Sequence, residues 1–148
     1  MMKKYKRYCV IICAFIFLVV AQNCIQTYAA NAADTEWSYN VGGNSDDVRY
    51  TSKREKTNNS KAYMKVSNFS GKSDDRLKVT LVDQSGNKFS TDYPRSIKGT
   101  GEYSLTNMAN EDRGVCKVKI KMWSNEFRWF YTWSANGVWS PDSIGTYK

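Results

Sequence analysis

Residues 115–140 read VCKVKIKMWSNEFRWFYTWSANGVWS and hold four of the chain's five tryptophans. Within residues 116–122, the apolar side chains alternate strictly with three lysines. This period of two predicts a strand with one apolar and one basic face. Residues 127–133 alternate in the same way and place four aromatic side chains on one face: Phe127, Trp129, Tyr131 and Trp133.

Residues 123–126 form a short polar connection between these runs, which favours a turn and therefore an antiparallel hairpin. The expected register pairs the apolar side chains with the aromatic ones: Met122 with Phe127, Ile120 with Trp129, Val118 with Tyr131, and Cys116 with Trp133. A slip of one residue would place lysines against the aromatic row, so this register is the favoured one. We expect the aromatic row to be core, and Trp123, Phe130 and Trp139 to be the more exposed rings.

The N-terminal residues 1–33 have the features of a secretory signal peptide, with an expected signal helix. Four basic residues precede an apolar run at residues 9–21, and small residues gather at 29–33. A run of about 13 apolar residues is short for a bilayer, which needs about 20. An uncleaved anchor and a lipoprotein attached through Cys24 are the alternatives. The favoured interpretation is a secreted, extracellular protein with one mature domain at residues 34–148.

Removing the signal changes the charge and cysteine content of the chain. The mature part keeps 18 basic and 14 acidic residues, a net charge of +4 in place of +8. This charge is ordinary for a soluble protein and does not indicate nucleic-acid binding. Three of the four cysteines leave with the signal, so the mature chain has no intrachain disulfide and keeps only Cys116. We interpret Cys116 as a small buried apolar side chain.

The remaining sequence predicts further short strands. Residues 61–69 and 102–106 alternate as strands, residues 48–53 suit a short edge strand, and 55–60 suit a turn. A second hairpin is expected about the turn at 83–87, pairing Leu81 with Phe89 and Leu77 with Tyr93. Residues 107–114 suit one helical turn, and a last short strand precedes Pro141. About seven to nine short strands predict an all-β fold, a small antiparallel β-sandwich in preference to a barrel.

The composition excludes several kinds of chemistry. Histidine is absent, which removes histidine-based nucleophilic triads and the usual zinc sites. No glycine-rich phosphate loop is present, so neither a nucleotide nor another cofactor is expected. The acidic doublets Asp46-Asp47, Asp74-Asp75 and Glu111-Asp112 lie in polar, loop-like surroundings. They leave a hydrolase with two carboxylates as an alternative only, and we expect a protein that is not an enzyme.

One surface of the predicted central hairpin is a candidate ligand-binding site. It comprises Lys117, Lys119, Lys121, Trp123, Arg128 and Phe130. The predicted register sets Lys121 opposite Arg128, a like-charge pair that an anionic partner would relieve. The alternative is a solvated face on which lysine stems shield Phe130.

The chain resembles small uncharacterised exported proteins of Gram-positive bacteria. The resemblance rests on the Lys-rich signal ending in alanines, on the segments 49–50, 56–61 and 99–103, and on Gly137-Val138-Trp139-Ser140-Pro141-Asp142-Ser143. The chain is also similar to some bacteriocin-like peptides in its aromatic-rich, disulfide-free β composition.

The expected function is non-enzymatic binding at a bacterial cell envelope through the basic-aromatic face. The partner would be an anionic cell-wall polymer or a membrane surface. A secreted antimicrobial or membrane-active, bacteriocin-like toxin is the alternative function.

Overall fold

The structure is a computed structural model that describes residues 32–41, 47–124 and 132–143. The predicted signal peptide, apart from Ala32 and Ala33, lies outside these residues, as do Arg128, Phe130 and the aromatic positions 127, 129 and 131.

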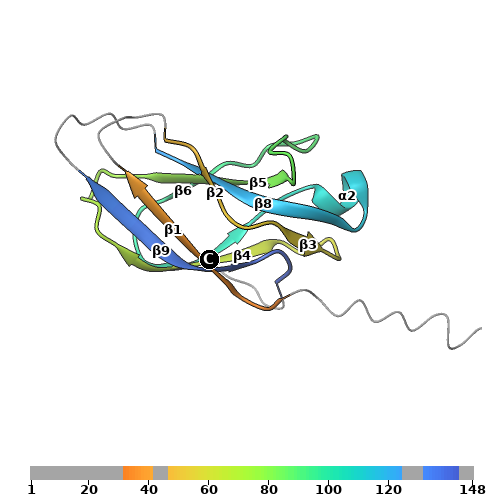
Figure 1. The fold of residues 1–148 in the computed structure, drawn as a ribbon, viewed down its shortest axis with the longest axis horizontal. Helices are drawn as coiled ribbons and strands as arrows, with labels where there is room; N and C mark the ends of the chain where they lie inside the picture. The colour runs from red at the N-terminus through yellow and green to blue at the C-terminus, as the bar shows by residue number, and fades with distance from the viewer. Residues whose placement is uncertain (1–31, 42–46, 125–131, 144–148) are drawn as a thin grey trace, which may run out of the picture.

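The described residues form a small antiparallel β-sandwich, which confirms the predicted fold class (Figure 1). They contain nine strands and one short helix, α2 (Ala109–Arg113). The strands are β1 (Thr35–Val41), β2 (Arg49–Tyr50), β3 (Arg54–Lys56), β4 (Ala62–Phe69), β5 (Leu77–Asp83), β6 (Arg95–Ile97), β7 (Gly101–Leu105), β8 (Cys116–Trp123) and β9 (Trp133–Ser140).

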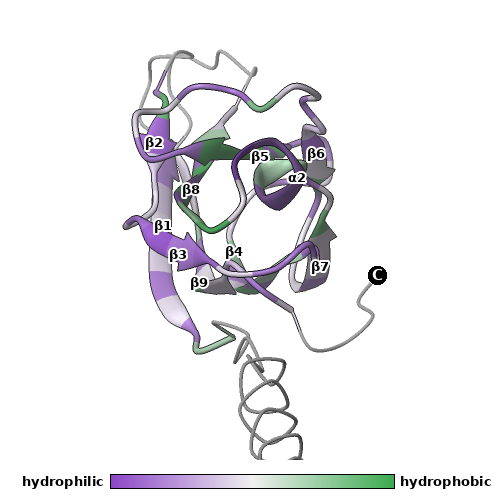
Figure 2. Cartoon of the chain, turned by 90° about the vertical axis from the view of Figure 1, so that its right-hand side faces the viewer, coloured by the Kyte–Doolittle hydropathy of each residue, from purple (hydrophilic) through white to green (hydrophobic). Residues whose placement is uncertain are grey.

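The strands divide into two sheets that share no strand. One sheet has the order β1-β9-β4-β7, and the other has the order β2-β8-β5-β6 with β3 also paired to β8. Figure 2 shows the two layers end-on, with α2 at the near end of the sandwich. Each strand of the β8 sheet therefore turns one face toward the β9 sheet and the other toward solvent or a covering loop.

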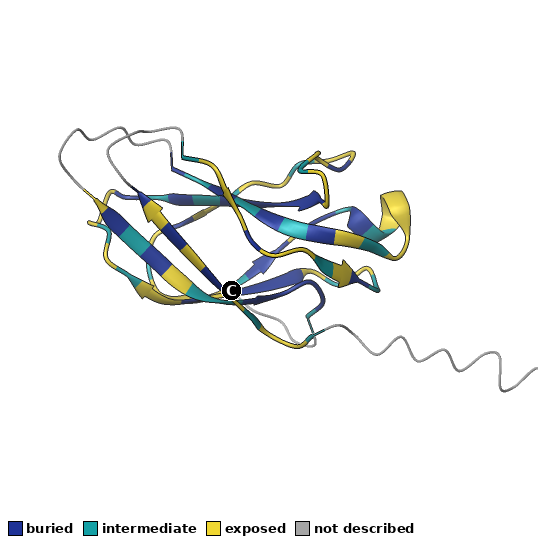
Figure 3. Ribbon diagram, viewed as in Figure 1, coloured by how far each residue is buried: buried dark blue, intermediate teal, exposed yellow. Residues whose placement is uncertain are grey.

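The core lies between the sheets and is built by alternation along the strands. On β8, Val118, Ile120 and Met122 are buried while the lysines between them are exposed or half-buried, as predicted (Figure 3). On β9 the alternate residues Trp133, Ala135 and Trp139 are buried. Burying a large apolar side chain stabilises a fold by about 1.5–3 kcal/mol. The two apolar rows supply six of the nineteen buried residues of the core cluster, so the other strands contribute most of the rest.

The predicted central hairpin is wrong, because Cys116 pairs with Lys56 and Trp133 pairs with Val41, in different sheets. Both sides of β8 are occupied by other strands, β5 on one side and β2 and β3 on the other. Strand β9 pairs with β1 and β4 instead. The apolar rows of β8 and β9 therefore contribute to one core from opposite sheets. Trp139, which we expected to be exposed, belongs to the inward row of β9 and is buried.

The second predicted hairpin has the correct turn and the wrong partner. Gly86 N donates to Asp83 O, and Asp83 N donates to Asn87 O, so the chain reverses where predicted. Residues 88–94 then form no strand, and the Asp92 carboxylate among them accepts a hydrogen bond from Thr80 Oγ1 on the outward face of β5. Strand β5 pairs with β6, so Leu77 lies opposite Ile97 instead of Tyr93.

Several predictions of single elements are confirmed. The strands expected at 61–69 and 102–106 are β4 and β7, the edge strand within 48–53 is β2, and the helical turn within 107–114 is α2. The polar segment expected to turn at 55–60 instead begins inside β3. Strands β1 and β6 were not predicted.

Strands β1, β9 and β4 approach each other closely at Gly137. Gly137 pairs with Trp37 on one side and with Val66 on the other, beside a register shift in β4 between Val66 and Asn68. The Trp37 indole donates to Lys65 O and Val138 O, at 3.2 Å each. A Cβ atom at residue 137 would lie 1.9 Å from Lys65 O. The position therefore requires glycine for steric reasons.

We expect Gly137→Ala to destabilise the fold by about 1–3 kcal/mol, the usual cost of overpacking. Urea denaturation followed by tryptophan fluorescence measures this loss. Gly99→Ala is the matched control, because a Cβ atom there meets nothing within 4 Å. Equal stability of the two variants would contradict the steric role of Gly137.

Candidate functional site

The outward face of β8 carries the side chains that the sequence predicted as a binding surface. Lys117, Lys119 and Lys121 alternate with the buried residues of the same strand, so all three project away from the core. Lys117 is exposed, and Lys119, Lys121 and Trp123 are half-buried. We name these four residues and Tyr50 of β2 the basic face.

Two of the three lysines lie over aromatic rings. The Lys119 Nζ atom is 4.2 Å from the ring centroid of Tyr50, and the Lys121 Nζ atom is 5.3 Å from that of Trp123. Such cation–π contacts attract the ammonium group but leave its charge in place. They therefore orient two positive charges that remain open to a further, anionic partner.

The predicted opposition of Lys121 and Arg128 is wrong. Lys121 pairs with Thr80 of β5 on one side and with Tyr50 of β2 on the other, so neither neighbouring position is taken by Arg128. Arg128 and Phe130 lie outside the described residues. The remaining predicted site residues share one face of one strand, in the arrangement that their alternation indicated.

Tyr50 is the member of the basic face that sequence reasoning missed. It is 44% exposed. It lies on this face because the next residue, Thr51, is hydrogen-bonded to β8. There, Thr51 N donates to Ile120 O, and Ile120 N donates to Thr51 Oγ1, at 3.0 and 2.9 Å. The only sequence signal was the expected edge strand. It did not indicate which strand would be the neighbour.

An acidic group limits the positive charge at one side of the face. The Asp92 carboxylate accepts bonds from Thr80 Oγ1 at 2.6 Å and from Lys88 Nζ at 2.7 Å. Burial acts to raise the pKa of Asp92, but these two partners and the nearby Lys121 charge outweigh it and lower the pKa. Glu55 lies opposite Lys117. The face is therefore moderately basic, with acidic residues at its margins.

Asp83 fixes the turn that borders Tyr50. Its carboxylate accepts from the backbone N–H groups of Ser85 and Asn87, and from Arg113 of α2 at 2.7 Å. Burial favours a higher pKa for Asp83, yet these hydrogen bonds prevail and lower the pKa. The turn places Gly86, with a φ of +94°, beside the Tyr50 ring. A side chain at that position would be strained by the positive φ, and its Cβ atom would contact the Tyr50 hydroxyl at 3.4 Å.

A groove of about 580 Å³ lies beside the basic face, where β1 and the chain near Tyr50 approach each other. Among the described residues that line it, none is basic, and Glu36 is the one carboxylate. The Trp37 indole N–H is already used by two backbone carbonyls. The groove is therefore polar but not cationic, and it does not extend the basic face.

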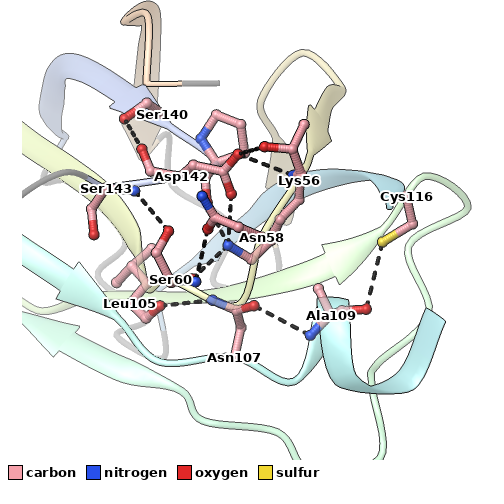
Figure 4. A network of polar contacts seen from close by, with 12 residues as sticks. Lys56, Asn58, Ser60, Leu105, Asn107, Ala109, Cys116, Ser140, Asp142 and Ser143 are labelled. Atoms are coloured by element: carbon pink, nitrogen blue, oxygen red, sulfur yellow. Dashed lines mark hydrogen bonds and ion pairs between the residues drawn. The ribbon is translucent and has the colours of Figure 1, made fainter. Parts of the chain in front are cut away.

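Cys116 lies at the start of β8 and packs half-buried against the core. Its thiol donates to Ala109 O across 3.7 Å, a contact drawn in Figure 4. Burial raises the pKa of the Cys116 thiol, so the reactive thiolate is disfavoured at neutral pH.

Neither a metal-binding cluster nor a membrane-spanning helix is found in the part of the chain that the structure describes. That part has no group of three or more acidic, cysteine or histidine side chains placed to hold a metal ion. None of its helices has the length and apolar character needed to cross a bilayer.

Comparison with known proteins identifies one family. The family described as "Protein of unknown function (DUF2712)" matches residues 25–143, which include every described strand. No curated protein matches the chain significantly, and no solved structure does.

The lowered pKa of Asp83 predicts an acid-dependent loss of stability. A carboxyl whose pKa is depressed by folding stabilises the protein above its unfolded pKa of about 3.9, and this contribution disappears as the pH falls through the folded value. We expect the difference in unfolding free energy between the wild type and Asp83→Asn to be largest above about pH 5 and to shrink below pH 4. Urea denaturation across this pH range measures it. Parallel pH profiles would contradict the prediction.

Proposed function

This chain belongs to the DUF2712 family, and we propose that it is a secreted, non-enzymatic protein that binds a phosphate-bearing anionic polymer of a Gram-positive cell envelope through its basic face. The observation that supports the proposal is the row of three outward lysines on β8, two of them held over aromatic rings.

The geometry of the row favours an extended ligand. Alternate residues of a strand are separated by about 6.6 Å, so the three lysines offer charges at regular intervals along one line. A polymer with repeated phosphodiesters can contact all three at once, whereas a small anion meets one. Aromatic rings beside the lysines supply flat apolar surface for the carbon backbone of such a polymer.

A polymer fits this face better than the interior of a membrane does. The exposed large apolar side chains among the described residues are Val48, Tyr50, Tyr93 and Val115. Tyr50 alone belongs to the basic face, and its ring is in contact with Lys119. A face with little protruding apolar surface is suited to surface contact through charge and stacking.

The proposal is tested by binding to immobilised poly(glycerol phosphate) at increasing salt. Exposed ionic contacts contribute about 0.2–1 kcal/mol each, so removing two should weaken binding by about two- to thirty-fold. We expect this loss for the double variant K119Q/K121Q, and we expect wild-type binding to weaken with ionic strength.

The matched control is K61Q/K65Q, which removes the same charge from two exposed positions of the other sheet, one just before β4 and one within it. Equal losses in the two double variants would show that only net charge matters and would contradict a specific face. Vesicles of phosphatidylglycerol form a second arm of the experiment. Leakage of an entrapped dye from them would favour the membrane-active toxin.

A further inference from the structure

A buried ion pair joins the two sheets at a place that the proposed function does not use. Lys56 ends β3 opposite Cys116 of β8, and Asp142 lies just beyond the end of β9. The two side chains are both 0% exposed, and Lys56 Nζ lies 3.0 Å from Asp142 Oδ1. Figure 4 shows them facing each other inside the fold.

The side-chain nitrogen of Lys56 and both carboxylate oxygens of Asp142 take part in hydrogen bonds. Lys56 Nζ donates to Ser60 O, to Pro141 O at 2.9 Å, and to Asp142 Oδ1. The other carboxylate oxygen, Oδ2, accepts from Thr57 N at 3.0 Å and from Thr57 Oγ1 at 2.6 Å. The amine is therefore held against one oxygen of the carboxylate while two donors hold the other.

Burial changes the chemistry that this pair can undergo. Separated charges are costly where both side chains are closed to solvent, so transfer of one proton from Nζ to Oδ1 becomes accessible. In agreement, burial lowers the pKa of the Lys56 ammonium, although Asp142 acts in the opposite direction. The transfer gives a neutral amine, which is a nucleophile, next to a protonated carboxyl group, whose carbon is the electrophile.

We propose that Lys56 and Asp142 condense without an external reagent to form an isopeptide bond between the two sheets. The Lys56 Nζ–Asp142 Cγ bond forms, and the Cγ–Oδ1 bond breaks. Two of the three ammonium protons leave with Oδ1 as one molecule of water, and the third remains on the amide nitrogen. The two opposite charges disappear together, so net charge is unchanged and no oxidant is needed.

Thr57 is the positioning residue of this step. Negative charge develops on Oδ2 when the amine adds to Cγ, and the Thr57 N–H and Oγ1–H groups already point at that oxygen. Preorganised donors of this kind lower the barrier to acyl transfer. The fixed approach of amine to carboxyl gives the reaction the high effective concentration of an intramolecular process.

The product removes two buried charges and keeps hydrogen-bond partners for the amide. The new amide N–H has Ser60 O and Pro141 O within reach as acceptors, and the amide oxygen keeps both Thr57 donors. The bond would close a loop across a sequence separation of 86 residues, which restricts the unfolded chain strongly. Cys116 is the free cysteine of the described residues, so no disulfide supplies such a closure there.

Intact-mass spectrometry of the purified, denatured chain tests the proposal. We expect the wild type to be lighter than its sequence by the mass of one water molecule. Proteolysis should release one branched peptide that joins Lys56 to Asp142. Wild-type protein that folds and yet keeps the full mass after prolonged incubation would overturn the proposal.

Variants separate the isopeptide from other losses of water. K56R removes the nucleophile and should have the full mass, whereas dehydration that persists in K56R would place it elsewhere, for example in a succinimide, and overturn the proposal. If K56R does not fold, the wild-type peptide map still decides.

T57V should slow the appearance of the lighter species after refolding at least tenfold, and T57S, which keeps the hydroxyl, should restore the rate. Equal rates for the wild type, T57V and T57S would show that the Thr57 hydroxyl plays no part in the reaction.

Discussion

The two sheets of this protein share no strand, so side chains that cross the interior are what hold them together. Most of that attraction is apolar and comes from rows such as those of β8 and β9. One polar contact between them is fully buried: the side chains of Lys56 and Asp142 are both 0% exposed, and every donor of the ammonium group has an acceptor. A pair of this kind is costly to bury and costlier to break, since the remaining charge would be left alone.

Strand β8 has two roles because its side chains alternate. Its inward row belongs to the core, and its outward row carries the lysines of the basic face. A shift of one residue in its pairing would bury the lysines and expose Ile120. The reciprocal bonds between Thr51 and Ile120 oppose that shift and also place Tyr50 beside Lys119. Stability and the proposed binding surface therefore depend on the same register.

Much of the candidate site follows from local sequence, and its surroundings do not. Period-two alternation is enough to put Lys117, Lys119 and Lys121 on one face, and the structure places them there. Tyr50 could not be assigned to that face, because 69 residues separate it from Lys119 and only pairing between distant strands joins them. The same holds for Asp92, whose place over β5 depends on its bond to Thr80.

The sequence alone determined the strand character of β4, β7 and β8, the face that each side of β8 presents, and the turn at Asp83. These features depend on alternation and on turn chemistry, which act over a few residues. Tertiary structure decided which strands are neighbours. Two apolar rows can bury each other equally well side by side in one sheet or face to face across a sandwich. In the fold, β1 and β4 occupy both sides of β9, while β5 occupies one side of β8 and β2 and β3 occupy the other. The two strands therefore lie in opposite sheets, and this arrangement places Lys56 beside Asp142.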